Sequence, residues 1–317
     1  MIFNQIPSTI RTPGSYAEFD SSNARPTSTA KPSHALLIGT KLSAGTITVE
    51  TVTPCTGGAA QADALAGVGS PLAGMARAFA EANPEAEFSL LAATEPSGGT
   101  AATGSLVFAS GTATADGYVH LYVGGVYCPV RVLTGDDQAD VATACYAAIV
   151  AMTRLPITAT NGTPGTTTLA AKWKGVAGND ILVELNREDG QALPAGITCT
   201  VTTMATGAGV PVIATTIAAI GSEWYDRFVT QFNDAATVAA LEVEALARWD
   251  AGAAIDAEVF VGYRGTYSNG AAYGAARNSP YSDTCDVELS PTPNWITAAV
   301  YAAVDASELD PARPLNT

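Results

Sequence analysis

The sequence predicts an α/β main domain that is discontinuous along the chain, with an inserted α+β domain and an extended N-terminal arm. Near both ends, short apolar segments alternate with segments of helical periodicity, which is typical of a sheet packed with helices. Between them, residues 97–210 are rich in Thr, Val and Tyr and are bounded by linkers containing Gly and Pro. We therefore assign 1–32 to the arm, 33–95 and 212–317 to the main domain, and 97–210 to the insert.

The arm is predicted from its turn formers. Prolines such as Pro7 and Pro13 disfavour a helix, whereas Tyr16 to Phe19 alternates aromatic side chains with a small and an acidic one. Without apolar periodicity the segment has little to bury against its own chain, so an extended arm is one interpretation. A frayed terminus is the other, and the residues leave both open.

The first part of the main domain reads as strand, helix and strand. His34–Gly39 is a short apolar segment closed by glycine, and Phe88–Ala92 is a second one. Between them, Ser70 can cap a helix with Pro71 in its first position, and Asn83-Pro84 ends it. The apolar side chains of that helix recur at helical spacing: Leu72, Met75 and Phe79. This order predicts parallel strands with a helix packed against them.

The insert is predicted to contain a hairpin, a helix and further strands. Gly124-Gly125 separates two strand-like segments and can adopt the positive φ that a two-residue turn needs. Asp136 or Asp137 is a candidate cap for a helix, and further strands are expected at Ile181–Leu185 and Thr198–Thr203. One face of that helix is expected to carry Val141, Cys145, Ala148 and Met152.

Helices are expected to return after the second linker, Gly207–Pro211. The four-residue spacing of Trp224, Phe228 and Phe232 indicates a helical stripe that packs into the core rather than a ligand-binding site. Asn233 or Asp234 should cap a second helix, whose apolar stripe is Val238, Leu241, Ala245 and Trp249. Strands are expected at Ala257–Gly262 and Cys285–Leu289, and an alanine-rich helix should begin at Trp295 and end before Pro311.

Composition excludes several classes of protein. The net charge of −15 argues against a nucleic-acid or anionic-membrane partner, which clustered Lys and Arg would meet. No apolar run is long enough to span a bilayer, so no direct membrane insertion is expected. The N-terminal residues lack the charge and apolar stretch of a signal peptide, so a cytoplasm-like compartment is expected.

Residues able to carry chemistry are few. The two histidines, His34 and His120, fall in predicted strands, and the five cysteines are scattered without zinc or redox spacing. Asp136, Asp137 and Asp140 do not follow a calcium-loop pattern, and acids are expected at a helix start. The Gly67-Val68-Gly69 segment is not a dinucleotide fingerprint, since its next glycine comes too late. We expect no catalytic, cofactor-binding or metal-binding residue.

Several segments resemble the tail sheath proteins of Mu-like contractile phages, in the same order and at plausible spacing. They are Phe3–Pro7, Pro13–Ala24, Lys174–Ile181, Ile220–Asp226, Ala275–Pro280 and Asp310–Leu315. Members of that family continue well past the last of these segments into a C-terminal region that packs on neighbouring subunits. We therefore expect this sequence to be a fragment or a shortened relative that lacks that region, and to be mainly monomeric.

The resemblance implies a structural subunit that stacks helically around a tail tube and contracts to drive the tube through the host envelope. Its implied partners are neighbouring sheath subunits, the tube protein, the baseplate and the tail terminator. Its implied location is the virion tail, after assembly in the host bacterial cytoplasm. A secreted or surface adhesin-like module and, less favoured, a small α/β enzyme are the alternatives that the residues leave open.

Overall fold

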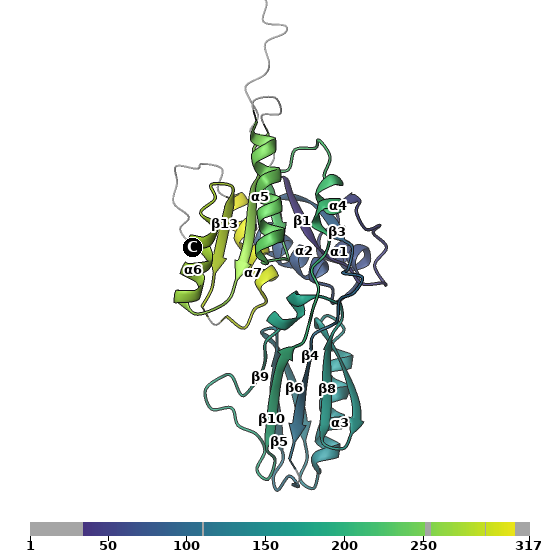
Figure 1. Cartoon of the computed structure of the whole chain (residues 1–317). Helices are drawn as coiled ribbons and strands as arrows, with labels where there is room; N and C mark the ends of the chain where they lie inside the picture. The colour runs from purple at the N-terminus through teal and green to yellow at the C-terminus, as the bar shows by residue number, and fades with distance from the viewer. Residues whose placement is uncertain (1–33, 110, 251–254, 289, 308–317) are drawn as a thin grey trace, which may run out of the picture. The chain divides into compact units, whose positions relative to one another are not determined.

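The computed structural model describes residues 34–109, 111–250, 255–288 and 290–307. The predicted arm, residues 1–32, and the segment Asp310–Leu315 lie outside the described residues. The chain is mixed α/β, with several sheets packed against helices (Figure 1).

The main sheet has six strands in the order β13-β12-β11-β1-β3-β2. Its strands are β1 (His34–Thr40), β2 (Val52–Pro54), β3 (Glu87–Ala93), β11 (Arg227–Thr230), β12 (Glu258–Tyr263) and β13 (Ser282–Asp286). Neighbours run parallel, except that β2 runs antiparallel to β3. The parallel pairing of β1 with β3 confirms the expected strand, helix and strand unit.

Helices cover both faces of this sheet, which is why its central strands are apolar at consecutive positions. On one face, α1 (Gly58–Ala66), α2 (Pro71–Ala82) and α7 (Asn294–Ser307) pack with Leu37 and Leu90. On the other face, α4 (Ile213–Ala218) and α5 (Ala235–Trp249) pack with Leu36 and Leu91. The remaining helix is α6 (Tyr267–Arg277), whose Tyr273 packs against this second cluster.

Short polar side chains begin the helices as the sequence predicts. Ser70 accepts a hydrogen bond from the Ala73 amide at 3.0 Å, and Asp234 accepts one from the Thr237 amide at 2.9 Å. Asp137 caps α3 (Gln138–Ala151) by accepting from two amides of its first turn. These bonds satisfy amides that the helix itself leaves without a partner.

The strands between the two linkers form two further sheets. Their elements are β4 (Thr103–Phe108), β5 (Gly117–Val123), β6 (Val126–Val132), β7 (Ile157–Thr163), β8 (Thr166–Ala171), β9 (Val183–Leu185), β10 (Cys199–Ala205) and the 3₁₀ turn Val176–Asp180. One sheet has the order β10-β4-β8-β7 and the other β6-β5-β9, and α3 contacts both (Figure 1). The hairpin turn is confirmed, with φ of 55° at Gly124 and 81° at Gly125.

Several expectations were wrong. Trp224, Phe228 and Phe232 do not share a helix, because Phe228 lies in β11 with the other two outside it, and Trp224 is 42% exposed. Trp249 is exposed, and Arg248 is the buried residue at the end of α5. In α3, Ile149 is buried where Ala148 was expected.

The boundaries of several strands also differ from the prediction. The last strand is Ser282–Asp286, which begins before the predicted Cys285–Leu289. The strand expected from Ile181 begins at Val183, because the 3₁₀ turn precedes it. The strand expected from Thr198 to Thr203 runs from Cys199 to Ala205.

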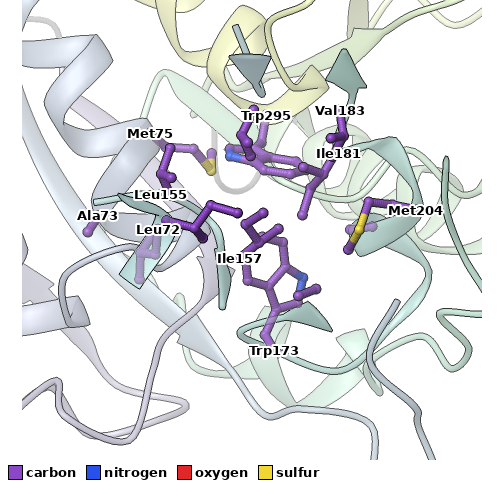
Figure 2. Packing of buried hydrophobic residues seen from close by; sticks show 14 of the residues in the cluster. Leu72, Ala73, Met75, Leu155, Ile157, Trp173, Ile181, Val183, Met204 and Trp295 are labelled. Atoms are coloured by element: carbon purple, nitrogen blue, oxygen red, sulfur yellow. The ribbon is translucent and has the colours of Figure 1, made fainter. Parts of the chain in front are cut away.

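One apolar cluster joins the main sheet to the elements between the linkers (Figure 2). Met75 of α2 and Trp295 of α7 contribute from the main-sheet side, and Ile181 and Met204 contribute from the other. Trp173 is 2% exposed, and its ring meets that of Trp295 edge to face, with centroids 5.4 Å apart. This pair lies where the two groups of elements meet.

We predict that Trp173→Ala lowers the free energy of unfolding by about 3–5 kcal/mol, because it empties a buried volume that the surrounding backbone cannot refill. Urea denaturation followed by circular dichroism measures the change. The matched control is Trp249→Ala, whose side chain is 59% exposed and should change stability by about 0.5 kcal/mol or less. Equal losses in the two variants would contradict the packing described here.

Candidate assembly surfaces

The two linkers are hydrogen-bonded to each other where the chain leaves and re-enters the main sheet. Thr100 and Ala208 exchange backbone bonds in both directions, at 3.0 and 3.1 Å. The Asn179 side chain adds a second pair, since its amide donates to the Gly207 carbonyl and its oxygen accepts from the Gly207 amide. Asn179, in the Gly-Asn-Asp segment that resembles the sheath family, therefore holds Gly207 where the chain returns to the main sheet.

We call the paired linkers, with Asn179, the neck. The neighbouring Asp180 links the neck to the main sheet. Its carboxylate accepts a hydrogen bond of 2.8 Å from the Asn294 side chain at the start of α7. Burial raises the pKa of Asp180, against the opposing effects of Arg264 and of hydrogen bonds from Asn233 and Asn294. The neck is thus tied to α7 by a polar contact beside the Trp173–Trp295 pair.

Acidic side chains gather at the edge of the main sheet where the parallel strands begin. Arg227 pairs with Asp226 at 2.6 Å and with Asp305 at 2.7 Å. Glu258 begins β12 beside Asp283 of β13. The carboxylates at this edge therefore outnumber the single cation among these residues, Arg227.

This arrangement perturbs Glu258 strongly. Burial, followed by repulsion from Asp283 and Asp305, raises the pKa of Glu258 from its ordinary value of 4.5 to about 7, although Arg227 opposes the shift. The hydroxyl of Tyr301 donates to Asp283 at 3.0 Å, which keeps that neighbouring carboxylate close. No single segment of sequence signals this cluster, because its members come from β11, β12, β13 and α7.

The main sheet ends in two different edge strands. β2 is short and contains Pro54, which cannot donate a ladder hydrogen bond. At the other edge, the Val259 amide donates to the Tyr281 carbonyl and the Val287 amide donates to the Tyr263 carbonyl. Because amides alternate in direction along a parallel strand, the backbone groups of the intervening even-numbered residues of β13 point away from β12.

The two histidines lie in different sheets. His34 in β1 contacts the Ser89 hydroxyl through Nε2 at 3.0 Å and meets the ring of Tyr225 edge to face. His120 in β5 contacts the Tyr127 hydroxyl through Nδ1 at 2.7 Å. The structure does not bring them together.

The aspartates considered for a cation site serve the start of α3. Asp137 and Asp140 form a reciprocal capping box, and Asp136 accepts from the Leu133 amide at 2.7 Å. Gly67-Val68-Gly69 lies in the connection between α1 and α2, so no strand leads directly into it along the chain. Within the described residues, no group of three or more His, Cys, Asp or Glu side chains is arranged to hold a metal ion.

All five cysteines are free, and burial raises the pKa of each thiol. In the part of the chain that the structure describes, no helix is long and apolar enough to cross a bilayer.

We predict that Glu258 makes the protein less stable as the pH rises. Because the pKa of this carboxyl is higher in the folded state than in the unfolded state, its contribution to the free energy of unfolding is fully present below about pH 4.5. That contribution is lost as the pH approaches 7. Glu258→Gln, which does not titrate, should therefore lose less stability between pH 5 and 7.5 than the wild-type chain. Urea denaturation at both pH values measures this, with the exposed Glu188→Gln as control. An unchanged pH dependence in Glu258→Gln would contradict the assignment.

No family model matches the chain. The chain is 34% identical, over 320 aligned residues, to the Mu-like prophage FluMu tail sheath protein of Haemophilus influenzae. The match covers 99% of this chain and 64% of the relative, so the chain spans less than two thirds of the relative's length.

Solved structures of two sheath tail proteins also align with the chain. The one from Desulfitobacterium hafniense has a TM-score of 0.38 at 10% identity, covering 92% of this chain and 61% of that protein. The one from Listeria innocua has a TM-score of 0.34 at 11% identity, covering 87% and 57%. The sequence match confirms the predicted resemblance: along nearly its whole length, the chain is similar to a Mu-like prophage tail sheath protein.

Proposed function

We propose that the chain acts as a structural subunit of a contractile phage tail sheath. The single observation that carries the proposal is the 34% identity to a tail sheath protein across 99% of the chain. The subunits would assemble helically around the tail tube and contract to drive it through the host envelope. Their partners would be neighbouring sheath subunits, the tube protein, the baseplate and the tail terminator, within the virion tail.

We also propose the domain division that the sequence predicts, with 97–210 inserted into a main domain formed by 33–95 and 212–317. Strand pairing supports it, because the described strands from β4 to β10 pair among themselves and none joins the main sheet. The bonded linkers support it as well, since insertion is tolerated where entry and exit are adjacent.

Among the described strands, β13 has a partner on one side only, and we assign its other edge to strand exchange between subunits. Backbone groups of Ser282, Thr284 and Asp286 point away from β12, so an extended segment from a neighbour can pair with them. An arm such as residues 1–32 suits this role, because its prolines disfavour a helix. A contact between two different surfaces can repeat from subunit to subunit, and it generates a helical tube where the rotation does not close into a ring.

The proposal assigns the chain no catalytic residue, cofactor or metal. The free energy of contraction would come from metastable packing of the extended sheath, with domains moving as rigid bodies while the exchanged strands keep subunits connected. Bound nucleotide is not required by such a mechanism. The tail tube would separate the sheath from DNA, which suits a chain whose net charge is −15.

Negative-stain microscopy tests the function on a chain extended to the length of the Haemophilus influenzae relative, which we call the native-length protein. We expect tubes or stacked rings to form from purified protein without nucleotide. A native-length protein that stays dispersed at every concentration and ionic strength tested, or that forms only closed dimers, would overturn the sheath assignment.

We predict that deleting residues 1–32 blocks tube formation by the native-length protein and leaves the melting temperature of the 317-residue chain nearly unchanged. The reason is that a connecting arm contributes to contacts between subunits and buries little on its own subunit. Calorimetry of the chain and microscopy of the native-length protein give the two readouts. Unfolding of the shortened chain, or normal tubes from the shortened native-length protein, would show that the arm is not a connector.

A further inference from the structure

The helix α5 carries a second apolar face that its own sheet does not cover. Val238, Leu241 and Ala245 are buried against the main sheet. The outward face carries apolar side chains at three-residue intervals, with exposures of 65%, 52% and 59%: Val243, Leu246 and Trp249. We call these three residues the α5 stripe. Exposed tryptophan is uncommon on a surface and common at the centre of protein interfaces.

Negative charge surrounds the end of the stripe that carries Trp249. Glu223 and Asp256 are exposed in this part of the chain. The adjacent Arg248 does not offset them at the surface, because it is buried, pairs with Glu244 at 2.8 Å and donates to backbone carbonyls. A partner that covers the stripe should therefore offer an apolar hollow with positive charge at its rim.

The same chain has a hollow of that kind beside the neck. It measures about 440 Å³, within the roughly 300–1,000 Å³ typical of binding pockets. Apolar side chains line it together with two arginines: Val126, Ala151, Met152, Leu155, Arg77 and Arg154, with Thr153. We call it the neck hollow.

Positive charge predominates at the rim of the neck hollow. Arg77 and Arg154 both pair with Asp63, and the Arg154 side chain is still 69% exposed. Lys172 adds a third cation, since its ammonium donates to the Thr153 carbonyl at 2.7 Å. An arginine beside an apolar hollow can also stack on an indole ring, which favours tryptophan as the occupant.

A chain cannot fill its own hollow with its own stripe. The α5 helix packs with the cluster on one face of the main sheet, whereas α2, which supplies Arg77, packs with the cluster on the opposite face. The occupant must therefore come from another molecule. A second copy of this chain presents apolar side chains and the opposite charge together.

We propose that Trp249 and the α5 stripe of one copy dock into the neck hollow of a second copy. The inference rests on the proposed sheath function and names one of its contacts between subunits. Because stripe and hollow are different surfaces, each copy keeps one of them free after pairing. The contact can therefore repeat from copy to copy, and it builds a helical tube where the successive rotations do not close into a ring.

Sedimentation velocity of the 317-residue chain at low ionic strength tests the contact. The wild-type chain should be mainly monomeric when dilute and should associate as its concentration rises, and added salt should weaken the association. Trp249→Ala removes the docking side chain, and Ala151→Trp fills the hollow from its exposed rim. Each should raise Kd at least about tenfold, the loss expected of a central interface residue.

Matched controls separate docking from general surface effects. Tyr267→Ala removes an aromatic side chain that is 77% exposed on α6, and Ala147→Trp adds an indole to α3 one turn before the hollow. Both should associate as the wild-type chain does. Circular dichroism should show that all four variants are folded.

Mixing the two interface variants gives the decisive result. Ala151→Trp keeps a competent stripe and Trp249→Ala keeps a competent hollow, so each should be monomeric alone and the mixture should form dimers and nothing longer. A wild-type chain that never associates, unchanged association in both variants, or a mixture that stays monomeric would overturn the contact.

Imaging the native-length protein keeps this test separate from that of the function. Tubes that form equally well with Trp249→Ala or Ala151→Trp would refute the contact and leave the sheath function standing. The predicted dimers without tubes from the wild-type native-length protein would refute the function.

Discussion

The pairing of the two linkers is the constraint on which the rest of the structure depends. Thr100 and Ala208 exchange backbone hydrogen bonds, and Asn179 holds the adjacent Gly207 in both directions. Because the chain leaves and returns at one point, β1 and β3 can pair in one sheet with β11, β12 and β13 from the far end of the sequence. The entropy of closing so long a loop grows only slowly with length, so a few buried contacts at the neck suffice to hold it.

The neck also holds the two groups of elements against each other. The Trp173–Trp295 pair and the Asn294–Asp180 hydrogen bond join the elements beyond the linkers to α7, so the two groups of elements share apolar and polar contacts. Interiors packed in this way resist gradual deformation and move as bodies. The proposed sheath subunit, which would change its neighbours rather than its own fold, would use this property.

The sequence predicted correctly those features of the fold that short segments determine by themselves. The Ser70 and Asp234 caps, the Gly124-Gly125 turn and the parallel strands at His34 and Phe88 were visible because cap chemistry, positive φ and apolar runs are properties of short segments. The tail sheath resemblance came likewise from short segments in a fixed order. It gave the function that the sequence comparison with a known sheath protein supports.

Contacts between distant segments determined the features that the sequence did not predict. Phe228 and Phe232 match a helical spacing, yet β11 forms there because β1 and β12 offer parallel partners on both sides. Trp249 continues the helical spacing of the buried residues Leu241 and Ala245, yet Arg248 takes the buried position. Backbone carbonyls accept hydrogen bonds from its guanidinium there.

The assembly surfaces could not be read from the sequence at all. Glu258 and Asp305 are far apart in the chain, and the neck hollow combines α2, α3 and β6.

A helical reconstruction of tubes formed by the native-length protein tests the central claim most directly. The account predicts that neighbouring copies are related by one screw operation, so that the same two unlike surfaces meet at every contact along the tube and no nucleotide or metal lies between them. Neighbours related by two-fold axes, with like surfaces facing each other, would contradict it, as would a tube whose contacts depend on a bound ligand.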